Sequence, residues 1–143
     1  MTQILVCFFI FANSDRLHSE DRNVEITLLA GVEAYNKKQF RVAKNIFDEL
    51  TRLKPDCSEC YHMKGKSYGR LAENSSWLKA IKYAPKALES FEAAYRLAPR
   101  EIDIIEDLIS FYSKAPFFLG GDVDKAKKLT VKLKELKLSK HPD

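Results

Sequence analysis

Apolar residues recur at intervals of three and four along most of this chain, which is the spacing of one face of an α-helix. One such stripe consists of Phe40, Ala43, Phe47 and Leu50, and a later one of Ile105, Leu108, Ile109 and Tyr112. A helix with an apolar stripe buries it against a neighbouring helix. The pattern therefore predicts an all-α fold, and a chain of 143 residues is long enough for one domain.

One order of residue types occurs twice. A small residue is followed by an aromatic residue, an apolar residue and a proline at spacings of 4, 7 and 12. The first copy is Ala43, Phe47, Leu50 and Pro55, and the second is Ala87, Phe91, Ala94 and Pro99. Gly31 and Gly65 precede the two copies and lie 34 residues apart, which is the period of a helix–turn–helix repeat. We therefore expect helical pairs that are stable only when stacked.

The residue types of the repeat have a physical explanation. Its glycines and alanines are small enough for two helices to cross closely. Its two prolines have no N–H group, so each ends the second helix of a unit. Asp56, with Glu59 three residues later, is typical of a capping box and predicts the start of the next helix.

The second unit is longer than the first. Gly65 and Ala87 are 22 residues apart, whereas Gly31 and Ala43 are 12 residues apart, which leaves an insertion of ten residues. Apolar residues in the inserted region keep a helical spacing: Leu71, Trp77, Leu78 and Ile81. We therefore expect lengthened helices here and not an irregular loop. Pro85 either kinks the second of these helices or opens a new one.

A third, looser copy follows. Its first helix carries the stripe that ends at Tyr112, and its second carries Ala126, Leu129 and Leu133, but Thr130 replaces the aromatic residue and no proline closes the unit. Residues 115–122 are predicted to form a loop between these helices. Asp122, at the end of this loop, is expected to cap the last helix.

Residues 24–138 resemble the tetratricopeptide repeat (TPR) family in the small–aromatic–small–aromatic–proline order of the first two copies. The resemblance implies antiparallel helix pairs stacked as a short right-handed solenoid of about three repeats, with a concave binding face. Residues 68–73 and 115–122 also resemble segments of exported bacterial repeat proteins.

Residues 4–12 (ILVCFFIFA) form an unbroken apolar run. Nine helical residues rise about 13 Å, so this run cannot cross a hydrocarbon core of about 30 Å. It has the length of the apolar part of a secretory signal, with Ala12 near a cleavage site. Residues 1–20 are therefore predicted to be a signal peptide or a disordered N-terminus, and the protein to be exported to a periplasm. No Lys or Arg precedes the run, so the alternative is a cytoplasmic chain.

The charge of the chain does not favour nucleic acid as the partner, and no stable membrane insertion is expected. The net charge is +4, and a dedicated nucleic-acid-binding domain usually has a larger and more clustered excess. The last predicted helix is rich in lysine (Lys125, Lys127, Lys128, Lys132, Lys134, Lys137 and Lys140). It has no aromatic residues that could stack on bases, so we interpret the lysines as a solvated outer face.

Cys57 and Cys60 form the only close pair of cysteines. In the first turn of a helix they lie on nearly one face, so they are able to form a disulfide, and a helix N-terminus lowers the pKa of a thiol. A thiol–disulfide oxidoreductase is the alternative function, although the strand that precedes such a motif in redox enzymes is not predicted here. No other catalytic, metal or cofactor constellation is found, and we expect a protein that is not an enzyme.

The resemblance implies that the first helix of each unit lines a concave groove. Projecting these helices away from their apolar stripes predicts ten groove residues: Leu28, Val32, Tyr35, Asn36, His62, Lys66, Arg70, Glu106, Ser110 and Lys114. Such a mixture suits an extended peptide or a helix of a protein partner. The basic-plus-asparagine set by which some relatives clamp a terminal carboxylate is not matched. A structural role in a longer or self-associating solenoid is a further alternative, because no closing cap follows Leu138.

Overall fold

The computed structural model describes residues 22–140 of the chain, and this part is all-helical, without a strand. The predicted signal peptide at residues 1–20 lies outside the described residues. After a first helix at residues 22–36 come α2 (Phe40–Leu53), α3 (Ser58–Glu73), α4 (Trp77–Leu97), α5 (Ile102–Lys114), the short 3-10 helix η1 (Phe117–Leu119) and α6 (Val123–Lys140). The prediction of an all-α chain is thus confirmed for residues 22–140.

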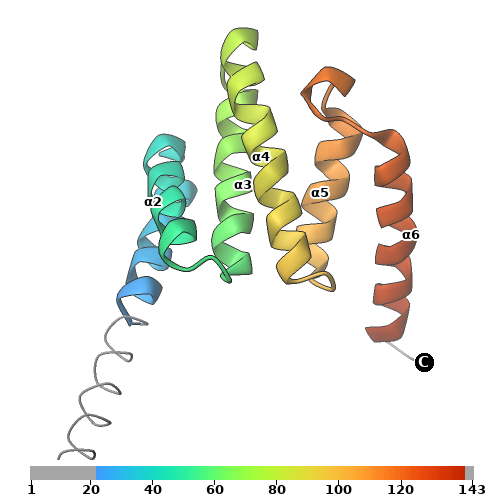
Figure 1. Cartoon of the computed structure of the whole chain (residues 1–143), viewed down its shortest axis with the longest axis horizontal. Helices are drawn as coiled ribbons and strands as arrows, with labels where there is room; N and C mark the ends of the chain where they lie inside the picture. The colour runs from blue at the N-terminus through green and yellow to red at the C-terminus, as the bar shows by residue number, and fades with distance from the viewer. Residues whose placement is uncertain (1–21, 141–143) are drawn as a thin grey trace, which may run out of the picture.

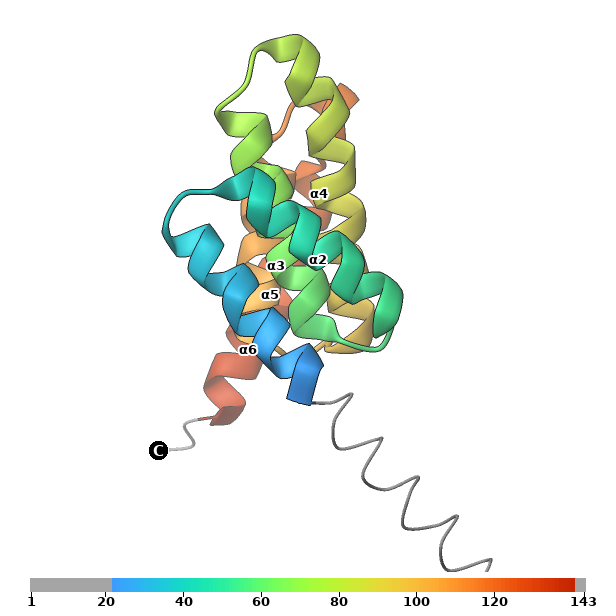
Figure 2. The same ribbon diagram turned by 90° about the vertical axis from the view of Figure 1, so that its left-hand side faces the viewer.

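The helices form a row in which successive members run in opposite directions (Figures 1 and 2). The main contacts join α2 with α3, α3 with α4, α4 with α5, and α5 with α6. Each helix is therefore held mostly by its neighbours in the sequence. Among the described helices, none is both long enough and apolar enough to cross a bilayer.

Helix ends follow the predicted signals in three of four cases. α2 ends at Leu53 and α4 at Leu97, each two residues before a proline of the repeat. Asp122 caps α6, because its Oδ1 accepts hydrogen bonds from the N–H groups of Asp124 and Lys125 at 3.1 and 3.0 Å. The predicted capping box at Asp56 is wrong. α3 begins one residue later than that motif requires, and Cys57 is its N-cap residue.

The insertion lengthens two helices, as expected. α3 continues to Glu73, and after a short turn α4 begins at Trp77 and continues for 21 residues. Pro85 lies inside α4, so it does not begin a new helix. Its side chain is exposed, and the ring therefore displaces no core side chain.

Two clusters of buried side chains lie along the row. The first joins Ala34, Ala43, Phe47, Leu50 and Cys60, and the second joins Tyr68, Ala87, Phe91, Leu108, Tyr112 and Ala126. Both depend on a glycine facing a phenyl ring. A Cβ atom added to Gly31 would lie 2.7 Å from Phe47 Cζ, and one added to Gly65 would lie 2.7 Å from Phe91 Cδ1. The repeated glycines therefore set how closely the paired helices approach.

A tyrosine–carboxylate hydrogen bond, which we did not predict, also occurs twice. The Tyr68 hydroxyl on α3 donates to Asp48 Oδ2 on α2 at 2.9 Å, and the Tyr112 hydroxyl on α5 donates to Glu92 Oε1 on α4 at 2.5 Å. In both cases the acid directly follows the phenylalanine of the repeat, and the tyrosine comes 20 residues after the acid. Each bond joins the second helix of one unit to the first helix of the next.

Exchanging Gly65 for alanine tests the close approach of α3 and α4. The new methyl group would meet the Phe91 ring, which is only 5% exposed, so we expect Gly65→Ala to lower the free energy of unfolding by about 1–3 kcal/mol. Gly69 is the matched control, because it lies in the same helix and a Cβ atom there meets nothing within 4 Å. Gly69→Ala is expected to stabilise the protein by about 0.5–1 kcal/mol. Urea unfolding measures both, and equal effects would contradict the packing argument.

The Tyr68–Asp48 bond predicts a pH-dependent contribution to stability. Burial of the Asp48 carboxyl opposes its ionisation, but hydrogen bonds from Lys44, Lys64 and Tyr68 outweigh burial and lower its pKa. A carboxyl group with a lowered pKa in the folded state stabilises the fold above its unfolded pKa of about 3.9, and this contribution is lost as the pH falls through the folded pKa.

We expect Tyr68→Phe to lower the free energy of unfolding at neutral pH by about 1–2 kcal/mol. The difference in the free energy of unfolding between this variant and the unaltered protein should become smaller below about pH 4. Tyr61→Phe is the control, since no hydrogen bond of the Tyr61 hydroxyl is found among the described residues. Urea titrations at several pH values measure the difference, and a deficit that is constant down to pH 2 would argue against the role of the ionised Asp48.

Candidate functional site

A groove with a volume of about 560 Å³ opens on one side of the row of helices. Its wall comes from the first helix, α3, α4, α5 and the segment around η1. The lining residues are Tyr35, Lys66, Gly69, Arg70, Ala72, Glu73, Ala80, Ala84, Phe91, Asp107, Ser110, Phe111, Lys114, Ala115, Pro116 and Leu119. Side chains from all three predicted units therefore meet in one open cavity.

Five of the ten predicted groove residues line this cavity: Tyr35, Lys66, Arg70, Ser110 and Lys114. They come from the first helices of the three units, which the TPR resemblance assigns to the concave face. The structure thus brings these five side chains together, although it does not test what they bind.

Three predicted groove residues lie elsewhere. Leu28 and Val32 are half-buried and pack against the first core cluster. Asn36 is exposed and does not line the groove. The first helix thus turns part of its predicted binding face toward α2 and α3, and only Tyr35 at its C-terminal end reaches the groove.

His62 and Glu106 make ion-pair contacts of their own. His62 Nε2 lies 2.8 Å from Asp107 Oδ2, and the His62 ring lies 6.0 Å from the Phe91 ring, measured between centroids. Glu106 Oε1 lies 2.7 Å from the amino group of Lys137 on α6. Glu106 therefore faces the last helix and not the groove.

Asp107 is a half-buried acidic residue of the groove that our sequence reasoning missed. Burial of its carboxyl opposes ionisation, but the hydrogen bond with His62 and the charges of His62, Lys66 and Arg70 outweigh burial and lower its pKa. The sequence could have predicted this position, because residues 107, 110, 111 and 114 are spaced by three and four and therefore lie on one face of the helix. The predicted residues of this helix, Glu106, Ser110 and Lys114, are spaced by four only, and such a series drifts around the helix by about 40° per step.

The cationic side chains of the groove differ in their contacts. The amino group of Lys66 lies 3.9 Å from Asp107 Oδ2 and 5.7 Å from the centre of the Tyr35 ring. Arg70 Nη1 lies 2.9 Å from Glu73 Oε2. For Lys114, which is exposed, no ion pair is found within residues 22–140. The groove thus combines an apolar wall with an arginine that is paired to Glu73, a lysine that is loosely paired to Asp107, and Lys114, for which no ion pair is found among the described residues.

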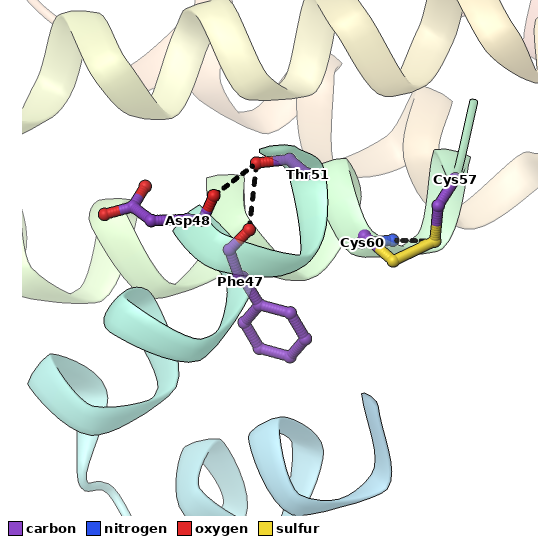
Figure 3. Close-up of a disulfide and its surroundings, with 5 residues drawn as sticks. All are labelled: Phe47, Asp48, Thr51, Cys57 and Cys60. Carbon is purple, nitrogen blue, oxygen red and sulfur yellow. Dashed lines mark hydrogen bonds between the residues drawn. A yellow bond between two sulfur atoms is a disulfide. The ribbon is translucent and has the colours of Figure 1, made fainter. Parts of the chain in front are cut away.

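Cys57 and Cys60 form a disulfide at the start of α3 (Figure 3). Cys57 Sγ also accepts a hydrogen bond from the backbone N–H of Cys60 at 3.1 Å. On the neighbouring α2, the Thr51 hydroxyl donates to the carbonyl oxygens of Phe47 and Asp48 at 2.9 and 3.1 Å. The disulfide therefore lies beside the first core cluster, and Cys60 belongs to it.

The surroundings of the disulfide favour a structural role. Cys60 is fully buried and Cys57 is half-buried, so an attacking thiolate has little access to the sulfur of Cys60. Among residues 22–140, no group of three His, Cys, Asp or Glu side chains is arranged to hold a metal ion. Redox chemistry at this pair stays an untested alternative.

Several lysines of α6 make contacts within the protein. Lys132 donates to the Tyr95 hydroxyl at 2.7 Å, and Lys137 pairs with Glu106. Lys127 lies 3.6 Å from Asp124, while Lys125 lies 3.9 Å from Asp122. This helix is therefore less available to an anionic partner than its lysine content indicates.

Removing the disulfide is expected to destabilise the protein moderately. In the chain-entropy model, a bond that closes a loop of four residues contributes about 2 kcal/mol. We expect the variant Cys57→Ser with Cys60→Ser to have a free energy of unfolding lower by about this amount, as measured by urea unfolding. A reducing agent should lower the free energy of unfolding of the unaltered protein by the same amount. The variant should be insensitive to the reducing agent. A far larger loss by reduction than by substitution would indicate another role for the pair.

Comparisons with known proteins assign no family to this chain. No protein-family model matches the sequence, and no curated protein matches it significantly. The resemblance to the tetratricopeptide repeats stays a prediction that rests on the residues of this chain.

Proposed function

We propose that this protein is a non-enzymatic interaction scaffold that binds a peptide or a helix of a protein partner in its groove. The observation that supports this most directly is the cavity in which Tyr35, Lys66, Arg70, Ser110 and Lys114 meet. These side chains belong to three helices that are separated in the sequence. A continuous surface built from three repeats offers an extended partner contacts along its length.

We also propose a TPR-like right-handed solenoid as the architecture. Successive helices run antiparallel (Figure 1), and the contact between a glycine and a phenylalanine recurs in the first two units. The tyrosine–carboxylate bond recurs between units. Repetition of both contacts is what a stack of similar helical pairs requires.

The chemistry of the groove favours a partner segment with apolar and acidic side chains. Ala84, Phe91 and Phe111 form an apolar part of the wall, while Lys66 and Lys114 supply positive charge. Asp107 is already engaged by His62 and Lys66. An incoming carboxylate would therefore meet Lys114 without competing with a described ion pair.

We propose that the protein works after export to the periplasm. The disulfide between Cys57 and Cys60 supports this, because disulfides persist in oxidising compartments and are rare in the cytosol. The apolar run at residues 4–12 supports it as well.

Charge reversal in the groove tests the proposed function. A photo-crosslinking residue at Ser110 would capture the partner, and the same residue at the exposed Ser139 on α6 is the control. We expect Lys66→Glu with Arg70→Glu to weaken binding of the captured partner by about tenfold or more. Lys127→Glu with Lys128→Glu, on the far helix, should leave binding nearly unchanged.

Circular dichroism would verify that both double variants keep their helical content. Binding that is equal in the two variants, or equal capture at Ser110 and Ser139, would contradict the groove assignment.

A further inference from the structure

Five large apolar side chains are exposed at one end of the molecule. Trp77, Leu78 and Ile81, in the first turns of α4, are 70%, 65% and 40% exposed, and Phe117 and Phe118 of η1 are 91% and 74% exposed. We call these five residues the apolar tip. They contribute little to the core, and exposed aromatic side chains in such a group indicate a binding surface.

The two segments of the tip lie at the same end of the row of helices. Both views place the start of α4 and the segment around η1 at the upper end (Figures 1 and 2). Their bases are in contact, since Leu88 of α4 packs beside Gly120. Ala80 and Ala84 of α4 also line the same cavity wall as Pro116 and Leu119.

The turn that presents the two phenylalanines has a defined backbone conformation. Gly120 has a φ of 99°, a value that favours glycine. A Cβ atom on Gly121 would lie 1.8 Å from the carbonyl oxygen of Ala115. The N–H groups of Leu119 and Gly121 both donate to the carbonyl of Pro116, at 2.9 and 3.1 Å. Phe117 and Phe118 are thus held outward by an ordered turn.

The charge around the tip is positive. Residues 74–88 contain three lysines and no acidic residue, and residues 108–121 contain Lys114 and no acidic residue. Lys79 and Lys82 are exposed beside Trp77 and Ile81. For these two lysines no carboxylate partner is found among the described residues. Their charge is therefore available to an anionic surface.

We propose that the apolar tip binds the surface of an anionic lipid bilayer, as a peripheral contact separate from the groove. Trp and Phe side chains partition into the interface between lipid and water, and each lysine near an anionic surface adds to the attraction. Phe117 and Phe118 are largely exposed and are not among the residues that line the groove. Projecting side chains fit a soft, flat acceptor that closes around them better than a rigid protein surface, which would need matching pockets.

Trp77 is the only tryptophan of the chain, so its fluorescence reports on the tip alone. With the full-length protein, vesicles of phosphatidylcholine that contain phosphatidylglycerol should shift the emission to shorter wavelength. Brominated lipids in the same vesicles should quench it. Vesicles of pure phosphatidylcholine should shift the emission less, and added salt should reduce the shift that anionic vesicles cause. Emission unchanged by anionic vesicles would overturn the proposal, even if the chain were attached to them through residues 4–12.

Two double variants separate the contributions. Phe117→Ser with Phe118→Ser, and Lys79→Glu with Lys82→Glu, should each lower the partition coefficient on anionic vesicles by more than about tenfold. The matched controls lie on α6: Val131→Ser with Leu138→Ser, which are 61% and 65% exposed, and Lys127→Glu with Lys128→Glu. These controls should change the partition coefficient less than about threefold.

Equal losses in the tip variants and in the α6 variants would overturn the assignment to the tip. The assignment would also be overturned if the tip variants lost the partner captured at Ser110 but bound vesicles unchanged, because the tip would then belong to the protein interface. Loss of vesicle binding with unchanged capture at Ser110 supports two separate surfaces. The proposed groove function can fail while the vesicle result stands, since the groove variants and the tip variants change different residues.

Discussion

The architecture depends on the absence of a side chain at two positions. At Gly31 and Gly65 the phenyl rings of Phe47 and Phe91 occupy the space that a Cβ atom would need. Each ring lies against the glycine of the partner helix, so the two helices of a pair come closer than a side chain at that position would allow. This contact positions the next helix, because Phe91 belongs to the same buried cluster as Leu108 and Tyr112 of α5.

The tyrosine–carboxylate bonds extend this arrangement from one pair to the next. Tyr68 and Tyr112 are almost completely buried, at 3% and 4% exposed, yet each hydroxyl reaches a carboxylate on the preceding helix. A buried hydroxyl without a partner would cost stability, whereas one bonded to an ionised acid contributes to it. The rings therefore join the units through apolar burial, and the hydroxyls favour one register between them.

The sequence predicts the helices better than the faces that they present. Prolines, glycines and apolar spacing depend on local chemistry, so the ends of α2 and α4 and the lengthened α3 and α4 were predicted correctly. The direction of a side chain also depends on how its helix is rotated against its neighbours. This rotation turns Leu28 into the core, Glu106 toward α6 and Asp107 into the groove. The recurring interval from phenylalanine through acid to tyrosine could have been found from the sequence alone.

The ten-residue insertion connects the two surfaces of the molecule. It lengthens α3 and α4 beyond what the first unit contains, and the added turns of α4 supply Ala80 and Ala84 to the groove wall. On the same helix, Trp77 lies three residues before Ala80 and seven before Ala84, so all three lie near one face. Small residues on this face leave room inside the groove, while the large residue at its end stays exposed. A single extension of the repeat thus deepens a cavity for one kind of contact and ends in a projection suited to another.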